Sequence, residues 1–160
     1  MSAMLVSHVV ISLVGIVAGF VVAYGFLANR NLPRWTAVFL STTIATSVSG
    51  FLLPAEKILP SHVLGVLSLI TLSIATYAEY AKAHTGGWRS AYIVTALISQ
   101  YFNVFVLVVQ SFQKIPVLKA IAPTQTEPAF AVAQLAVLVG FIAIGYMSLK
   151  RYSVKAMVVS

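Results

Sequence analysis

Cysteine and aspartate are absent from this chain of 160 residues. The only carboxylates are Glu56, Glu79 and Glu127. Without a thiol the chain cannot form disulfides, thiolate metal sites or a cysteine nucleophile. Because carboxylates are so scarce, hydrolytic, nucleophilic and phosphoryl-transfer catalysis also lack the residues they need. We therefore expect a protein that is not an enzyme.

Charge is scarce as well, since 8% of the residues are charged and 60% are apolar. Soluble domains carry roughly 25% charged residues, so this composition excludes a water-soluble domain, and disorder requires the opposite composition. The net charge of +7 comes from basic residues scattered singly or in pairs, which argues against nucleic-acid binding. The composition predicts an integral membrane protein whose main partner is the lipid bilayer.

Long apolar runs are what the sequence has instead. A helix needs about 20 apolar residues to cross the hydrocarbon core. Because lipid offers the backbone no hydrogen-bond partner, each such run should be helical. The expected fold is all-α, one domain over residues 1–160 with five transmembrane helices. The runs cover residues 3–27, 35–53, 61–80, 90–112 and 128–149.

The connection before the fifth run contains an apolar segment with a single lysine, residues 115–122. Two interpretations of this segment stay open. It is either a short amphipathic helix lying in the membrane interface or an ordinary extended loop.

Lysine and arginine are distributed unevenly among the loops, which predicts the orientation. Cytoplasmic loops are enriched in these residues, and an outside N-terminus places the larger basic group in the cytoplasm. We therefore expect the N-terminus outside, the C-terminus in the cytoplasm, and a location in the cell inner (plasma) membrane. The larger group is Arg30, Arg34, Lys82, Arg89, Lys150, Arg151 and Lys155, and the smaller is Lys57, Lys114 and Lys119.

Polar side chains inside or beside apolar runs are the candidate functional residues, because a polar group in lipid is costly. Several share one face of the fourth run, namely Thr95, Ser99, Asn103 and Gln110. In the expected orientation, most of the others fall near the outer face, which predicts a polar pocket there. The candidate ligand-binding residues are His8, His62, Asn103, Gln110, Gln134, Glu56 and Glu127.

Four interpretations of this pocket compete. His8 and His62 could ligate a metal or the iron of haem b. The pocket could instead bind a quinone or a lipid head group, as in an accessory subunit of a larger complex. In a third interpretation, the face around Asn103 lines a route for a small solute, as in a channel or transporter. In the fourth, the same residues are hydrogen bonds between helices.

Small and hydroxyl residues predict where helices approach closely. Gly15 and Gly19 form a small-xxx-small pair in the first run. The second run is rich in serine and threonine, which either line a polar pore or bond to carbonyls of their own helix. Near the third connection, Glu79 is placed to pair with Lys82, and His84 is expected to be solvated.

Three segments carry a resemblance, namely Pro60–Gly65, Tyr101–Gln110 and Lys114–Pro128. They resemble small bacterial membrane proteins of unassigned function. The resemblance implies a bacterial inner membrane and names no activity or cofactor. Because five short helices enclose little volume, we expect the chain to associate with copies of itself or with a larger membrane complex.

Overall fold

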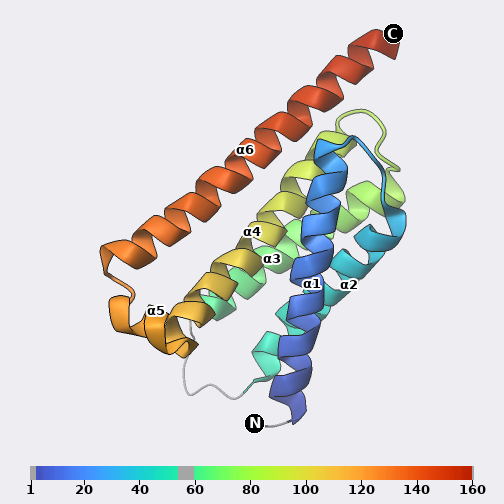
Figure 1. The fold of residues 1–160 in the computed structure, drawn as a ribbon. Helices are drawn as coiled ribbons and strands as arrows, with labels where there is room; N and C mark the ends of the chain where they lie inside the picture. The colour runs from blue at the N-terminus through green and yellow to red at the C-terminus, as the bar shows by residue number, and fades with distance from the viewer. Residues whose placement is uncertain (1–2, 54–59, 160) are drawn as a thin grey trace.

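The computed structural model describes residues 3–53 and 60–159, and 87% of these residues are helical. No strand occurs in these residues, so the all-α prediction is confirmed. Figure 1 shows the arrangement. The elements are α1 (Ala3–Leu27), α2 (Pro33–Leu52), α3 (Pro60–Thr76) with its π-helical continuation η1 (Tyr77–Ala81), α4 (Trp88–Lys114), α5 (Pro116–Ile121) and α6 (Pro128–Val159).

Five helices in the described residues are long and apolar enough to cross a membrane, as expected. They are α1, α2, α3 continued through η1, α4, and α6. Their ends lie within about two residues of the apolar runs, except that α6 continues to Val159. Lys150 and Arg151 end the apolar run without ending the helix.

Proline and left-handed residues set the helix boundaries. Asn29 has a φ of 51°, and beyond it the amide of Arg30 donates to the carbonyl of Gly25 at 2.8 Å, which closes α1. Pro33 then begins α2, where its missing N–H is harmless. Prolines also begin α5 and α6. The segment at residues 115–122 therefore contains a helix, as one of the two interpretations predicted.

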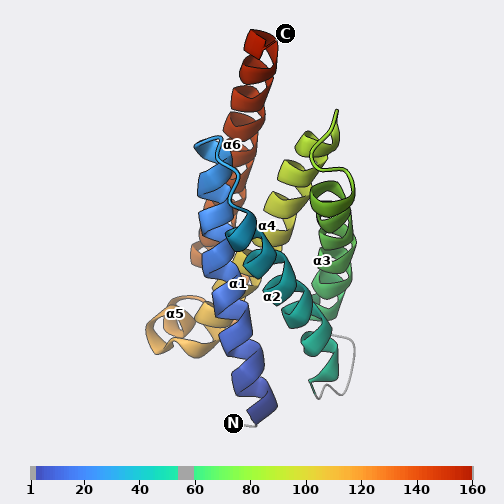
Figure 2. The ribbon, with the colours of Figure 1, turned by 90° about the vertical axis from the view of Figure 1, so that its right-hand side faces the viewer.

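The long helices pack around α4, which contacts α1, α3, α5 and α6. On the other side, α2 lies between α1 and α3. Figures 1 and 2 show α6 extending past the bundle, with the two termini at opposite ends. We call the end that carries the α1–α2 and α3–α4 connections the basic end, because Arg30, Lys82 and Arg89 lie there. The other is the N-terminal end.

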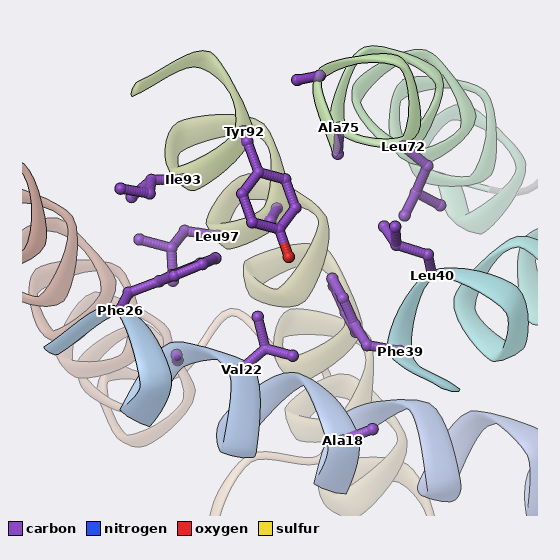
Figure 3. Close-up of a cluster of buried hydrophobic side chains, with 13 residues drawn as sticks. Ala18, Val22, Phe26, Phe39, Leu40, Leu72, Ala75, Tyr92, Ile93 and Leu97 are labelled. Carbon is purple, nitrogen blue, oxygen red and sulfur yellow. The ribbon is translucent and has the colours of Figure 1, made fainter. Parts of the chain in front are cut away.

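The apolar core lies between α1, α2, α3 and α4, towards the basic end. Small side chains such as Ala18 and Ala75 let the helix backbones approach closely. The ring of Phe26 packs edge-on against Tyr92, with the centroids 5.3 Å apart. Figure 3 shows this cluster. Its labelled residues are Ala18, Val22, Phe26, Phe39, Leu40, Leu72, Ala75, Tyr92, Ile93 and Leu97.

Candidate functional site

A hydrogen-bonded group of polar residues joins α1, α2 and α4. Gln100 on α4 is 1% exposed, and its Nε2 donates to the carbonyl of Ile16 on α1 at 2.8 Å. Asn103 Nδ2 donates to Thr43 Oγ1 on α2 at 3.2 Å. The same Nδ2 lies 3.4 Å from Gln100 Oε1. Three helices are therefore linked through two amides, which lie one turn apart.

The glycines of α1 make this contact possible. A Cβ at Gly19 would lie 2.0 Å from Gln100 Oε1. A Cβ at Gly15 would lie 3.0 Å from Thr42 Oγ1. Both glycines thus mark close approaches. Gln100 was not among the candidate residues selected from the sequence. The sequence feature that could have identified it is a long amide side chain within an apolar run.

Several hydroxyl groups of α4 and α2 are also bonded, whereas the buried Thr46 Oγ1 on α2 has no partner among the described residues. Ser99 Oγ donates to the carbonyl of Thr95 at 2.9 Å and contacts Thr71 Oγ1 on α3 at 2.7 Å. On α2, Ser41 and Thr42 bond to carbonyls four residues earlier in the same helix. These contacts are those of helix packing, and they favour that interpretation over a pore lining.

The two early histidines both contact the last turn of α2. His8 Nδ1 lies 2.8 Å from Ser49 Oγ. The ring of His62 stacks on Phe51, with the centroids 5.6 Å apart. Residues two apart on a helix point roughly 200° away from each other, so the rings pack on nearly opposite faces of α2. Within the described residues, no group of three histidines or carboxylates could hold a metal ion.

Gln134 lies between α6 and α4. Its Nε2 donates to the carbonyl of Phe105 at 3.2 Å. Its Oε1 is buried and has no hydrogen-bond partner among the described residues. Because the carbonyl of Phe105 must receive an N–H, the amide orientation is fixed and Oε1 is the atom left over. Gln110 lies half-buried on α4, towards the same end of the bundle.

Glu127 organises the loop before α6. Its Oε1 accepts bonds from the backbone N–H of Thr124 at 3.1 Å and from the Thr124 hydroxyl at 2.7 Å. Its Oε2 accepts from the N–H of Thr126 at 3.1 Å. The Thr124 hydroxyl is the main reason that the pKa of Glu127 is lowered. The sequence candidate Glu56 lies outside the described residues.

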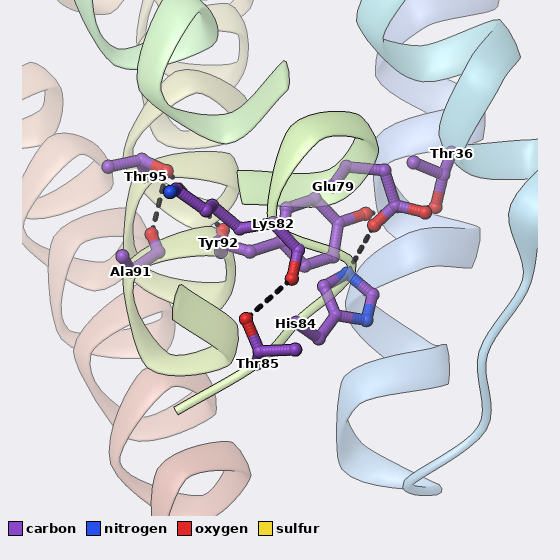
Figure 4. A network of polar contacts seen from close by, with 8 residues as sticks. All are labelled: Thr36, Glu79, Lys82, His84, Thr85, Ala91, Tyr92 and Thr95. Atoms are coloured by element: carbon purple, nitrogen blue, oxygen red, sulfur yellow. Dashed lines mark hydrogen bonds and ion pairs between the residues drawn. The ribbon is translucent and has the colours of Figure 1, made fainter. Parts of the chain in front are cut away.

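At the basic end, two expectations are wrong. Glu79 is bonded by His84 Nε2 rather than by Lys82. Lys82 Nζ lies instead over the rings of Tyr77 and Trp88, at 5.5 and 5.7 Å from the centroids. His84 is not solvated, because its side chain is 14% exposed. Figure 4 shows the His84 ring reaching back to Glu79.

The backbone explains this reversal. Beyond η1, Ala83 and His84 have φ values of 44° and 60°, which turn the chain back over the end of the bundle. The His84 ring then stacks on Tyr92, with the centroids 5.0 Å apart. The Tyr92 hydroxyl lies 2.9 Å from Thr36 Oγ1 on α2. The α3–α4 connection therefore packs against α4, whose Tyr92 is bonded in turn to α2.

Five long apolar helices joined by polar contacts indicate a multi-pass membrane protein. Its membrane and its orientation stay predictions. No family model, curated protein or solved structure matches the chain. Its function has therefore to be inferred from the contacts described above.

Proposed function

We propose that this chain is a non-enzymatic membrane protein that binds the hydroxyl of a lipid-soluble head group, of the quinol class, between α4 and α6. The observation that carries the proposal is the buried, unpartnered Oε1 of Gln134. A buried acceptor without a donor costs about 1–3 kcal/mol. A ligand hydroxyl bonded to Oε1 would remove that cost.

The hydrogen-bonding character of Gln134 Oε1 determines which kind of ligand group it can bind. Oε1 is an acceptor only, and the Nε2 of Gln134 is already bonded to Phe105. A quinone carbonyl is an acceptor too, so it gains nothing at Oε1. A quinol hydroxyl is a donor and matches it. The proposal therefore favours the reduced head group over the oxidised one.

Aromatic side chains near this contact suit a flat ring. Tyr101 packs against Phe105 on its own helix α4 and against Phe141 on α6, with centroid distances of 6.1 and 5.9 Å, respectively. Aromatic pairs at such distances contribute about 0.5–1.5 kcal/mol beyond simple burial. A quinol ring between α4 and α6 would extend this cluster. Because most of α6 is exposed, such a molecule could enter sideways from the lipid.

The expected orientation puts this site near the outer leaflet, since Gln134 lies in the second turn of α6. A role as an accessory subunit that holds quinol for a partner complex fits this location. The alternative, a solute channel along Asn103, is less favoured because Asn103 is bonded to Thr43. Haem binding is also less favoured, since His8 and His62 pack on different faces of α2.

The test is a binding titration of the purified protein in lipid nanodiscs with a short-chain quinol and the matching quinone. We expect the quinol to bind at least about tenfold more tightly, a difference of about 1.4 kcal/mol. Gln134→Leu should lose this preference. Gln125→Leu is the matched control, because Gln125 also donates an amide N–H to a carbonyl of α4. Equal binding of quinol and quinone, or unchanged binding by Gln134→Leu, would refute the proposal.

A further inference from the structure

The basic end of the bundle contains a small cavity between the α1–α2 connection and the start of α4. Its volume is about 10 Å³, which is room for about one water-sized group. The polar part of its wall includes Arg30, Asn31, His84, Arg89 and Tyr92. No carboxylate is among the residues that line it. The wall is therefore rich in donors and positive charge.

We infer that this cavity binds a phosphate oxyanion, as presented by an anionic phospholipid head group or by free phosphate. The site is separate from Gln134, which lies near the other end of the bundle. The small volume admits one phosphate oxygen and leaves the remaining substituents outside. A phosphodiester is therefore as acceptable as inorganic phosphate.

The two arginines come from distant parts of the chain, Arg30 from the α1–α2 connection and Arg89 from the first turn of α4. Arg89 Nη2 donates to Asn29 Oδ1 at 3.1 Å, which fixes its guanidinium beside the α1–α2 connection. Arg30 directly follows Asn29, and its backbone N–H is bonded to Gly25. Guanidinium groups offer planar sets of N–H donors that match phosphate oxygens. Two of them at one cavity make a site for a single anion.

Two hydroxyls add a further donor. Tyr92 and Thr36 both line the cavity and bond to each other at 2.9 Å. Only one of their two hydrogens can lie in that bond, so the other can point to a ligand. Figure 4 shows both residues beside His84.

Among the described residues, Glu79 is the carboxylate closest to this cavity, and its single negative charge is opposed by the two arginines of the wall. Glu79 is bonded to His84 and is not part of the cavity wall. Arg34, Lys82 and Arg151 lie at the same end of the bundle and raise the positive potential there. If this end faces the cytoplasm, as the basic loops predict, it meets the anionic lipids that such pockets bind.

The test measures binding of inorganic phosphate to the detergent-solubilised protein, and retention of phosphatidylglycerol against phosphatidylcholine by native mass spectrometry. We expect Arg30→Gln and Arg89→Gln each to weaken binding at least about tenfold. Arg34→Gln is the matched control, because this exposed arginine lies outside the cavity wall, and it should change binding less than about twofold. Arg30 is exposed, so its variant keeps the test valid if Arg89→Gln does not fold.

The two probes separate the sources of the phosphate. Retention of phosphatidylglycerol that depends on Arg30, with no binding of inorganic phosphate, supports the lipid. Binding of inorganic phosphate that depends on Arg30 supports the free anion. Equal losses in all three arginine variants would show only general attraction to charge and would overturn the inference. Binding of neither probe would overturn it as well.

Discussion

Helices α4 and α6 are almost equally apolar but are used differently. The best spanning window of α4 has a mean hydropathy of 1.9 and that of α6 has 2.1. Inside the bundle, 39% of the α4 window is buried, against 6% for α6. Helix α4 contacts α1, α3, α5 and α6, and it buries apolar residues such as Ile93 and Leu97 together with Gln100. On the described part of α6, the buried residue is Ser148, which bonds to the carbonyl of Ile144 in its own helix. Mean hydropathy thus identifies a helix that can span, but it does not show which helix the others pack around.

In water the hydrophobic effect buries apolar side chains, but in lipid this driving force between helices is absent. Lipid tails are as apolar as leucine, so helices associate through tight packing and hydrogen bonds. Gln100 and Gly19 supply both at the contact between α4 and α1. On α6, Gly140 has no neighbour that a Cβ would touch. Variants that treat the two helices alike should therefore have unequal effects.

The largest difference is expected for valine at the two glycines. Gly19→Val places a Cβ 2.0 Å from Gln100 Oε1, so the buried Gln100 side chain must move and its bond to Ile16 is disrupted. We expect the free energy of unfolding to fall by about 3 kcal/mol. Gly140→Val should change it by less than about 0.5 kcal/mol. Denaturant titration in detergent micelles measures both, and equal losses would show that α6 packs as tightly as α4.

A leucine truncation tests the core against the exposed face of α6. Leu72 on α3 is fully buried, whereas Leu135 on α6 is 59% exposed. Leu72→Ala should cost about 2 kcal/mol, because it leaves a cavity in the core. Leu135→Ala should cost under about 0.5 kcal/mol, since lipid fills the space. The same titration measures both, and a large loss for Leu135→Ala would reveal that a protein surface covers it.

Much of the fold could be predicted because its signals are local. Length and apolarity suffice to identify a spanning helix, and the five runs match α1, α2, α3 with η1, α4 and α6. The end of α6 could not be predicted from the same signal. Lys150 and Arg151 mark the end of the apolar run, but no proline or glycine follows to end the helix.

The site was harder to predict because its contacts join distant parts of the chain. Gln100 bonds to Ile16 on another helix, and a single sequence does not show which helices are neighbours. His84 was expected in solvent because it lies in a connection between two apolar runs. Its actual position depends on left-handed backbone at Ala83 and His84, for which an alanine and a histidine give little warning.

Variants of two amide residues test the same comparison of α4 with α6, and smaller losses in the free energy of unfolding are expected. Gln100→Leu removes the bond between α4 and α1, and we expect a loss of about 1 kcal/mol. Gln134→Leu removes a bond to Phe105 but also removes a buried acceptor without a partner. These effects oppose each other, so the net change should be under about 0.5 kcal/mol. Thermal unfolding in micelles compares them, and a larger loss at Gln134 would mean that Oε1 has a partner.

The smallest effect is expected in the loop that leads into α6. This loop is held by local hydrogen bonds to Glu127, whereas α4 is held by contacts with other helices. The pKa of Glu127 in the folded protein is lowered from 4.5, chiefly by the Thr124 hydroxyl. A lowered folded pKa means that the carboxylate stabilises the loop fully above the unfolded value. This contribution is lost as the pH falls through the folded value.

Amide hydrogen exchange of Thr126 should therefore lose protection between about pH 6 and about pH 3, after correction for intrinsic rates. The N–H of Thr126 donates directly to Glu127 Oε2, so it reports the carboxylate's charge. Glu127→Gln should show weak protection at both pH values, because a neutral amide oxygen accepts less strongly. The N–H of Gln125 donates to the carbonyl of Ala122 and is the internal control. Constant protection of Thr126 in the unmodified protein would mean that backbone packing, and not Glu127, holds the start of α6.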